Sequence, residues 1–174
     1  MLITRFSRRP ESARTRGVVA LVPVLVPVLL ALTSCSGTVE ISSPDLDVEQ
    51  KEACRDFVAA LPDRLADEPM REVSPDDAVG AAYGDPAIVL TCGAAIPPEF
   101  DETQSCEVSN GVGWYVPSEV FDDQGADVTM TAVGYEPVVQ LQVPGRYRPD
   151  GPAAAIAELA AGVKAHLTLV KDCR

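Results

Sequence analysis

The chain has few of the residues on which many enzymes and nucleic-acid-binding proteins depend. It has one histidine, 5% aromatic residues, and 14 Lys and Arg against 26 Asp and Glu, which gives a formal net charge of −12. A single histidine excludes metal sites built from several histidines and leaves little scope for histidine-based catalysis. The acidic balance argues against nucleic-acid binding, because phosphate contacts need a surplus of Lys and Arg. The hydrophobic content of 47% is nevertheless that of a globular protein.

The first 34 residues have the pattern of an export signal. Five arginines and a single acid stand before an uncharged run that extends from Gly17 to Ser34. Pro23 and Pro27 interrupt this run and would weaken an isolated membrane-spanning helix. We therefore predict a signal peptide over residues 1–34, whose removal leaves a mature chain with a charge of −16.

The predicted signal peptide ends in Leu32-Thr33-Ser34-Cys35, which resembles a bacterial lipobox. The thiol of Cys35 would take a diacylglycerol group, and two or more acyl chains anchor a protein durably where one chain does not. We expect lipid attachment at Cys35 and a location on the extracytoplasmic face of the cell membrane. The alternatives are an uncleaved signal anchor, or an ordinary secretory signal with a coincidental cysteine.

Four cysteines remain after Cys35, namely Cys54, Cys92, Cys106 and Cys173. An even number in an exported domain indicates two disulfides, for which three pairings are possible. We prefer Cys54–Cys173 and Cys92–Cys106, since the second pair closes a short loop between two strands and the first ties the first helix to the end of the last helix. Zinc binding is disfavoured because no Cys-x-x-Cys spacing occurs.

Local patterns predict two main helices in the exported domain. Residues 35–46 are small, polar and acidic, and we expect a flexible tether there. Asp47 can cap a helix, with Gln50 completing a capping box. Gly151-Pro152 should open the last helix, whose apolar stripe comprises Ile156, Leu159, Val163, Leu167 and Val170. Ser74-Pro75 predicts a further short helix.

Between the helices the patterns predict strands. They are a buried strand over 87–92, a hairpin around Asn110-Gly111, a strand over 128–133, and a strand over 139–143 in which Gln140 and Gln142 form a wet face. The expected fold is α+β, with an antiparallel sheet of four or five strands and the N- and C-terminal helices packed on one face. Residues 47–174 should form this single domain.

Few side chains are candidates for chemistry. His166 is expected to be a partly buried structural residue of the last helix, and Asp122, Asp123 and Asp127 to form a solvated loop rather than a Ca²⁺ site. Trp114 and Tyr115 should point to opposite sides of a strand, so one is a candidate for binding a ligand, with cross-strand packing the default for both. We assign no catalytic, metal or cofactor residue.

Several segments resemble a family of actinobacterial lipoproteins of unknown function, DUF3515. They are Cys54, Ala60-Leu61-Pro62, Ala82-Tyr83-Gly84-Asp85-Pro86 with Ala87 to Leu90, Cys92-Gly93, Asn110 to Trp114, and Val133 to Pro137 with Val139 to Pro144. The resemblance implies an anchored cell-envelope protein of an actinobacterium, and it implies no activity, cofactor or catalytic residue.

The sequence leaves three hypotheses of function. The first is a non-enzymatic envelope lipoprotein that binds an envelope protein or a cell-wall ligand. The second is an envelope protein that binds a small ligand or a cation through acidic loops. The third is an envelope enzyme in which His166 or Tyr83 meets a carboxylate with a perturbed pKa.

Overall fold

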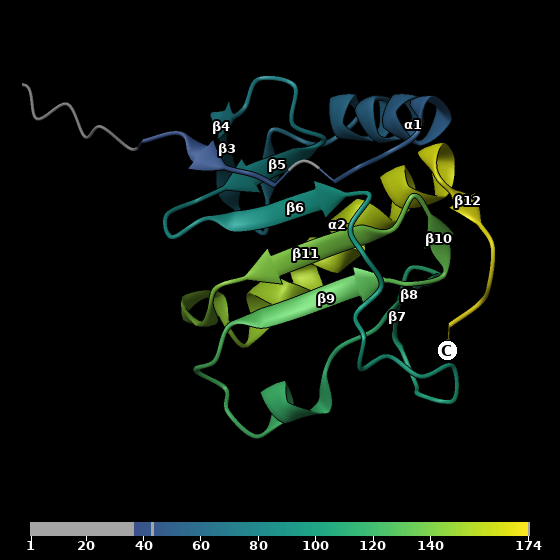
Figure 1. The fold of residues 1–174 in the computed structure, drawn as a ribbon. Helices are drawn as coiled ribbons and strands as arrows, with labels where there is room; N and C mark the ends of the chain where they lie inside the picture. Colours follow the sequence, from purple (N-terminus) through teal and green to yellow (C-terminus); the bar gives the residue numbers. More distant parts are fainter. Residues whose placement is uncertain (1–36, 43, 174) are drawn as a thin grey trace, which may run out of the picture. The chain divides into compact units, whose positions relative to one another are not determined.

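The computed structural model describes residues 37–42 and 44–173 (Figure 1). The chain divides into two units, Met1–Ser34 and Cys35–Arg174, and all the described residues belong to the second unit. The predicted signal peptide, its cleavage site and the lipid attachment at Cys35 lie outside the described residues.

A six-stranded antiparallel sheet forms the centre of the domain, flanked by two helices. The strand order is β2 (Arg64–Leu65), β3 (Glu68–Arg71), β5 (Gly80–Tyr83), β6 (Ile88–Cys92), β11 (Val139–Val143) and β9 (Val128–Ala132). The helices are α1 (Val48–Ala59) and α2 (Asp150–His166). The α+β class is thus confirmed. The sheet is larger than predicted because the sequence predicts no strand at β2, β3 or β5, and the predicted hairpin forms a separate two-stranded sheet.

One face of the sheet and the facing side of α2 make the core. The alternate residues Ile88, Leu90 and Cys92 of β6, Val128, Met130 and Ala132 of β9, and Val139, Leu141 and Val143 of β11 are all buried. On α2, Ile156, Leu159 and Val163 are buried in the same cluster. The apolar stripe predicted from the sequence therefore packs as expected up to the end of the helix, whereas Val170 lies beyond it and is exposed.

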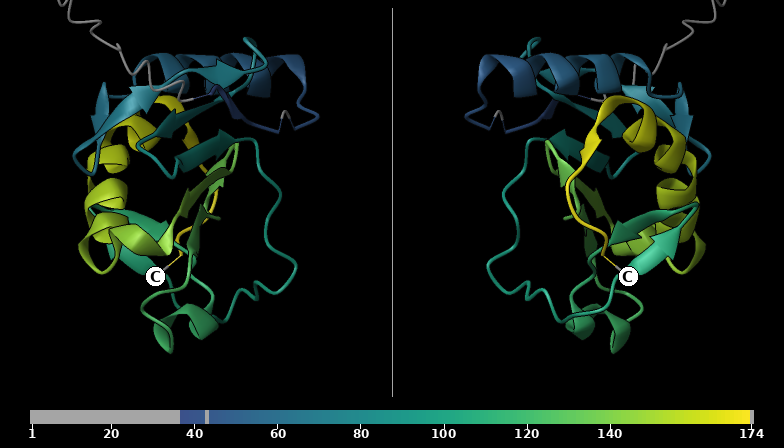
Figure 2. Two further views of the ribbon diagram at one scale, coloured as in Figure 1. Left: turned by 90° about the vertical axis from the view of Figure 1, so that its left-hand side faces the viewer. Right: turned by 90° about the vertical axis from the view of Figure 1, so that its right-hand side faces the viewer.

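Helix α1 begins at the predicted cap. The Asp47 carboxylate accepts from the Gln50 backbone N–H at 2.8 Å, and the Gln50 side chain accepts from the Asp47 N–H at 3.3 Å, which completes the capping box. Phe57 is buried on this helix and approaches Gly162 of α2. The two helices contact each other, but α1 crosses the end of the sheet at which β6 finishes (Figures 1 and 2). The predicted placement of both helices on one face is therefore only partly matched.

The predicted Asn110-Gly111 hairpin is present between β7 (Glu107–Ser109) and β8 (Val112–Trp114). Both turn residues have positive φ, 48° at Asn110 and 84° at Gly111, as a type I′ turn requires. After β8, Tyr115 forms a bridge to Thr131 of β9, with backbone hydrogen bonds of 2.8 and 3.0 Å. The hairpin is thereby joined to the edge of the main sheet.

The segment before α1 is more ordered than a tether. Strand β1 (Val39–Glu40) pairs in parallel with β4 (Val73–Ser74), and Ile41 is only 2% exposed. Leu46 packs against the core and lies over Gly93. The prediction of a flexible tether over residues 35–46 is therefore wrong from Val39 onward, because two apolar side chains dock on the domain.

The helix predicted at Ser74-Pro75 is also absent. Ser74 is the last residue of β4, and a turn closed by the hydrogen bond from Ala78 N to the Pro75 carbonyl leads into β5. A cap followed by proline is compatible with a turn as well as with a helix start. The extended pairing of β4 with β1 decides between them.

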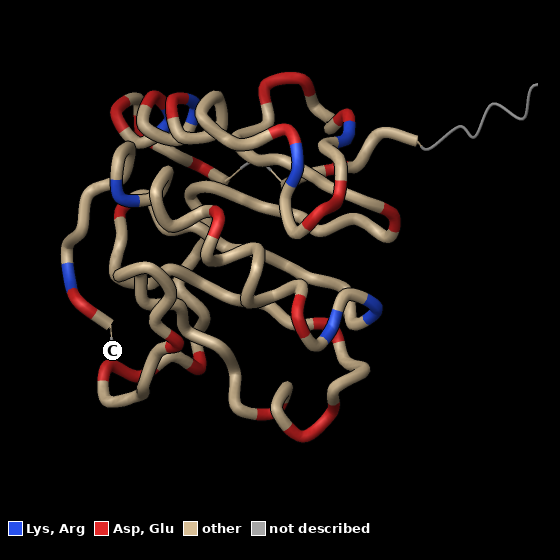
Figure 3. Tube along the Cα trace, turned by 180° about the vertical axis from the view of Figure 1, so that it is seen from behind, with Lys and Arg blue, Asp and Glu red and all other residues tan. Residues whose placement is uncertain are grey.

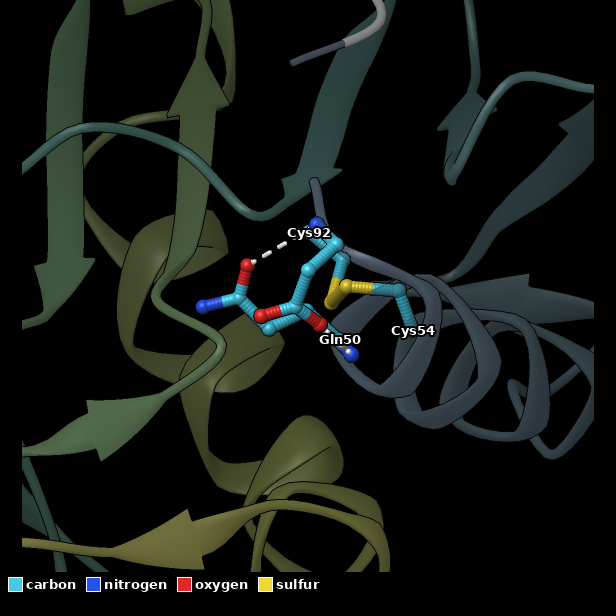
Figure 4. Close-up of a disulfide and its surroundings, with 4 residues drawn as sticks. Gln50, Cys54 and Cys92 are labelled. Atoms are coloured by element: carbon cyan, nitrogen blue, oxygen red, sulfur yellow. Dashed lines mark hydrogen bonds between the residues drawn. A yellow bond between two sulfur atoms is a disulfide. The ribbon is translucent and has the colours of Figure 1, made fainter. Parts of the chain in front are cut away.

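Two disulfides are present, Cys54–Cys92 and Cys106–Cys173, so the predicted pairings Cys54–Cys173 and Cys92–Cys106 are both wrong. Cys92 lies on the buried face of β6, where α1 presents Cys54 (Figure 4). The long loop after β6 instead carries Cys106 to the β7–β8 hairpin. There the C-terminal segment arrives, with the carbonyl of Cys173 against Gly113.

The C-terminal segment (residues 167–173) is a strap along the hairpin side of the domain. Its strand β12 (Thr168–Leu169) pairs with β10 (Tyr135–Glu136). Val170 N and Lys171 N both donate to the Gly134 carbonyl, at 2.9 and 3.2 Å. A Cβ at Gly134 would collide with the Lys171 carbonyl, so glycine permits this close backbone approach.

Replacing Cys54 and Cys92 together by alanine should lower the free energy of unfolding by about 4 kcal/mol, because the bond closes a chain segment of 38 residues in the unfolded state. Urea unfolding monitored by Trp114 fluorescence measures the change. The pairing itself is checked by mass spectrometry of non-reduced peptides. A peptide that links Cys54 to Cys173 would contradict the structure.

Candidate functional site

The second face of the sheet carries a polar surface. Because side chains alternate along a strand, Thr129 and Thr131 of β9 and Gln140 and Gln142 of β11 point away from the core. Thr129 pairs with Gln142 and Thr131 with Gln140 in the strand register. The four side chains therefore form a compact, uncharged group of hydrogen-bonding residues, and the wet face predicted from Gln140 and Gln142 is present.

A loop lies over this group and makes a cavity of about 500 Å³. Figure 2 shows the long loop after β6 standing off this side of the sheet. We call the cavity the sheet-face groove; it is lined by Ala94, Ala95, Ile96, Pro97, Pro98 and Glu99 of the loop, by Pro117, and by Thr129, Thr131, Gln140 and Gln142. One wall is thus apolar and proline-rich, the floor is polar, and Glu99 is the one charged residue of the lining.

Much of the hydrogen-bonding capacity of the floor is unused. Gln142 Nε2 donates to Gln140 Oε1 at 3.4 Å, and this is the one hydrogen bond that either side-chain amide makes within the described part of the chain. The Oγ1 of Thr131 has no hydrogen-bond partner among the described residues although the residue is fully buried. Leaving a buried hydroxyl unpaired costs about 1–3 kcal/mol. The groove therefore holds donors and acceptors that a ligand could satisfy.

The loop is fixed at both ends. Gly93 N and Ala94 N donate to the Val138 carbonyl at 2.7 and 3.1 Å at its start. Further along, Phe100 packs edge-on against Tyr115, with ring centroids 5.0 Å apart. The loop that bounds the groove is consequently fixed on both sides of residues 95–99.

Trp114 and Tyr115 are the two aromatic candidates for binding, and both are buried, at 0% and 4% exposure. Trp114 lies in the core, and Tyr115 packs against Phe100. The default prediction of packing roles is confirmed. Neither ring is exposed for stacking on a ligand.

The aspartates considered for a cation site accept hydrogen bonds from the backbone instead. Asp123 Oδ1 accepts from Gly125 N and Asp127 Oδ1 from Gly145 N, each at 2.8 Å. In the described ranges no group of three or more His, Cys, Asp or Glu is placed to hold a metal ion. The carboxylates thus stabilise the loop between β8 and β9, and no observation favours a cation site.

His166 is exposed at the last residue of α2, so the prediction of partial burial is wrong. The helix turns this position outward because the buried stripe runs through Leu159 and Val163.

Tyr83 is fully buried, and its hydroxyl donates to the Pro62 carbonyl at 3.0 Å. Burial raises the pKa of Tyr83 to about 12, and the negative charges of Asp63 and Glu158 act in the same direction. A tyrosine held neutral in a backbone hydrogen bond has a structural role. The hypothesis of an envelope enzyme that uses Tyr83 is weakened, because the hydroxyl is buried and bonded to the backbone.

A second, smaller cavity of about 270 Å³ lies beside the short helix η1 (Ser118–Phe121). Its walls are mostly apolar and include Val120, Phe121, Met130 and Ile156. Arg148 at its rim donates to the carbonyls of Val120, Asp123 and Ala126 and so holds the loop that frames the cavity. The arginine is committed to the loop, and the cavity presents little polar chemistry.

Comparison with known protein families gives a match over most of the chain. The sequence model of the family described as "Protein of unknown function (DUF3515)" matches residues 16–171. The chain belongs to this family. No curated protein and no solved structure matches it significantly. In this DUF3515 member, no helix of the described residues is long and apolar enough to cross a membrane.

The Tyr83→Phe variant of the DUF3515 domain should change the alkaline part of the stability curve. The pKa of Tyr83 lies near 12 in the fold against 10 in the unfolded chain, so the unfolded state releases its proton first. Stability is unaffected by this group below pH 10 and falls as pH rises from 10 to 12. Removing the hydroxyl should therefore reduce the slope of the unfolding free energy against pH in this range by the contribution of roughly one proton. At neutral pH the variant should lose about 1 kcal/mol of stability, because the hydrogen bond is missing.

Urea unfolding at a series of pH values from about 8 to about 12, a range that spans the tyrosine titration, measures this change. The wild-type chain under the same conditions is the control. An unchanged slope in the variant would show that the hydroxyl is not buried as described.

Proposed function

We propose that this DUF3515 protein is a membrane-anchored lipoprotein of the actinobacterial cell envelope that works as a non-enzymatic binding module. The observation that carries the binding role is the sheet-face groove, an uncharged cavity floor within about 500 Å³ of space, with unused donors and acceptors. Its lining holds a single titratable side chain, Glu99, and no second titratable group with which that carboxylate could form an acid–base pair. Recognition is therefore the role that the groove supports best.

The anchoring part of the proposal rests on the sequence around Cys35. The arginine-rich start, the uncharged run and Leu32-Thr33-Ser34-Cys35 stand in the order that lipoprotein export requires. The family match begins at residue 16 and so includes the uncharged run. Two disulfides in the folded unit are in keeping with export, since such bonds persist in oxidising compartments.

The docking of β1 limits how far the domain can stand from its anchor. Val39 is held on β4, and it follows Cys35 by four residues. Four residues span at most about 14 Å even when fully extended. A lipid on Cys35 would therefore keep the β1–β4 end next to the membrane, while η1 lies toward the opposite end of the domain (Figure 1).

The Cys35→Ser variant should lose lipidation, because an oxygen replaces the sulfur that accepts the diacylglycerol. The expected result is an unprocessed chain without the lipid mass, whereas the wild type gives a mature chain that begins at acylated Cys35. Intact mass spectrometry and membrane fractionation of the cells measure this.

The Ser34→Ala variant is the matched control, because it keeps a small residue before Cys35 and should be processed normally. Recovery of the same lipid mass from Cys35→Ser would overturn the anchoring proposal.

A further inference from the structure

The sheet-face groove has a composition that restricts the chemistry of its ligand. Figure 3 shows Asp and Glu spread over helices and loops of the domain, with few Lys or Arg. The groove floor, in contrast, consists of two Thr and two Gln, and Glu99 is the one charge of the lining. An anionic ligand would find no cation in this lining, and the net negative charge of the chain would repel it.

The floor residues combine donors and acceptors. A Thr hydroxyl donates one hydrogen bond and accepts others, and a Gln side chain offers two N–H donors and one carbonyl oxygen. Sugar hydroxyls have the same dual character, and the C–H faces of a sugar ring can pack on apolar side chains. The proline-rich wall with Ile96, which is 50% exposed, supplies such an apolar surface.

Thr131 gives a second, independent indication. Its side chain lies on the groove side of β9, it is fully buried, and its Oγ1 has no partner among the described residues. A buried hydroxyl in a native fold is normally paired. Because this Oγ1 has almost no accessible surface, a ligand hydroxyl that pairs with it must displace the side chains that cover it.

The position of the groove on the sheet also distinguishes ligand classes. One recurring mode of peptide recognition pairs the backbone of an extended peptide with a strand edge. The groove floor is the flat face between β9 and β11, where side chains point outward and the ladder hydrogen bonds between these strands are already made. Recognition there depends on side-chain donors and acceptors, which favours a polyhydroxylated ligand over a peptide.

From these observations we propose that the sheet-face groove binds a neutral saccharide, with the four polar side chains of its floor donating to and accepting from the hydroxyl groups of the sugar. This inference rests on the proposed binding role and names the class of its ligand. It does not depend on lipid attachment, so the mass of the N-terminus and the binding experiment can fail independently.

The test is titration of the full chain, purified with both disulfides formed, with neutral tetrasaccharides of N-acetylglucosamine, mannose and glucose. NMR detects the side-chain amide signals of Gln140 and Gln142 directly. The expected result is a saturable shift of these signals with at least one of the three saccharides. Failure of all three to shift them would overturn the proposal, as would binding only of an acidic tetrasaccharide or of an unstructured peptide.

Two threonine variants localise the binding. Thr129→Val removes a hydroxyl from the groove floor, and Thr168→Val makes the same change on the exposed strand β12, outside the groove lining. We expect about fivefold weaker binding for the first, the effect of one lost hydrogen bond, and unchanged binding for the second. Equal weakening by both, or by neither, would contradict a site in this groove.

Thr131→Val separates function from stability. Valine fills the same volume without an unpaired hydroxyl, so the melting temperature should stay unchanged or rise. Saccharide affinity should nevertheless fall about fivefold or more. A variant that melts lower and binds with unchanged affinity would show that Thr131 serves packing alone, and it would remove the hydroxyl from the proposed site.

Discussion

The alternation of side chains along the central strands is the constraint on which both the core and the groove depend. On β11, Val139, Leu141 and Val143 are buried on the core face beneath α2, and the residues between them face the groove. The pairing of Leu141 with Leu90 and with Met130 fixes the register on both sides. A slip of one residue would bring glutamines into the core, which the cost of burying their amides forbids. The polar floor is thus a direct consequence of how the apolar face is buried.

Covalent links hold the segments that the sheet does not. Helix α1 has two fully buried side chains, Cys54 and Phe57, and the bond to Cys92 fixes it at the end of β6. The C-terminal strap is a two-stranded pairing that would be weak by itself. It is held by close backbone approach at Gly113 and Gly134 and by the bond from Cys173 to Cys106. Both links join segments that are distant in sequence, so each restricts the unfolded chain strongly.

The features that could be predicted from the sequence are those with a local cause. The capping box at Asp47, the Asn110-Gly111 turn and the alternation over 139–143 each depend on residues within a few positions of one another, and all three are present. Strands β1 and β4 are two residues each and owe their existence to a pairing between distant parts of the chain, which no local pattern records. The disulfide pairing escaped prediction for the same reason, since it depends on where α1 and the strap arrive. The polar rows of the groove could be foreseen at Gln140 and Gln142, but the covering by residues 94–99 is a tertiary contact.

Among the described residues, two buried side-chain atoms lack a hydrogen-bond partner, Trp114 Nε1 and Thr131 Oγ1, and they belong to the same junction between β8 and β9. The two residues differ in whether another interaction offsets the cost of the unpaired atom. The indole of Trp114 buries a large apolar surface, which offsets the unpaired N–H. Thr131 has no such compensation, because a valine would pack equally well and leave nothing unpaired. A residue that costs stability without a packing gain is what a fold contains where a side chain serves recognition. The uncompensated cost of the Thr131 hydroxyl, more than the volume of the cavity, is the reason to expect function on the face of β9 and β11.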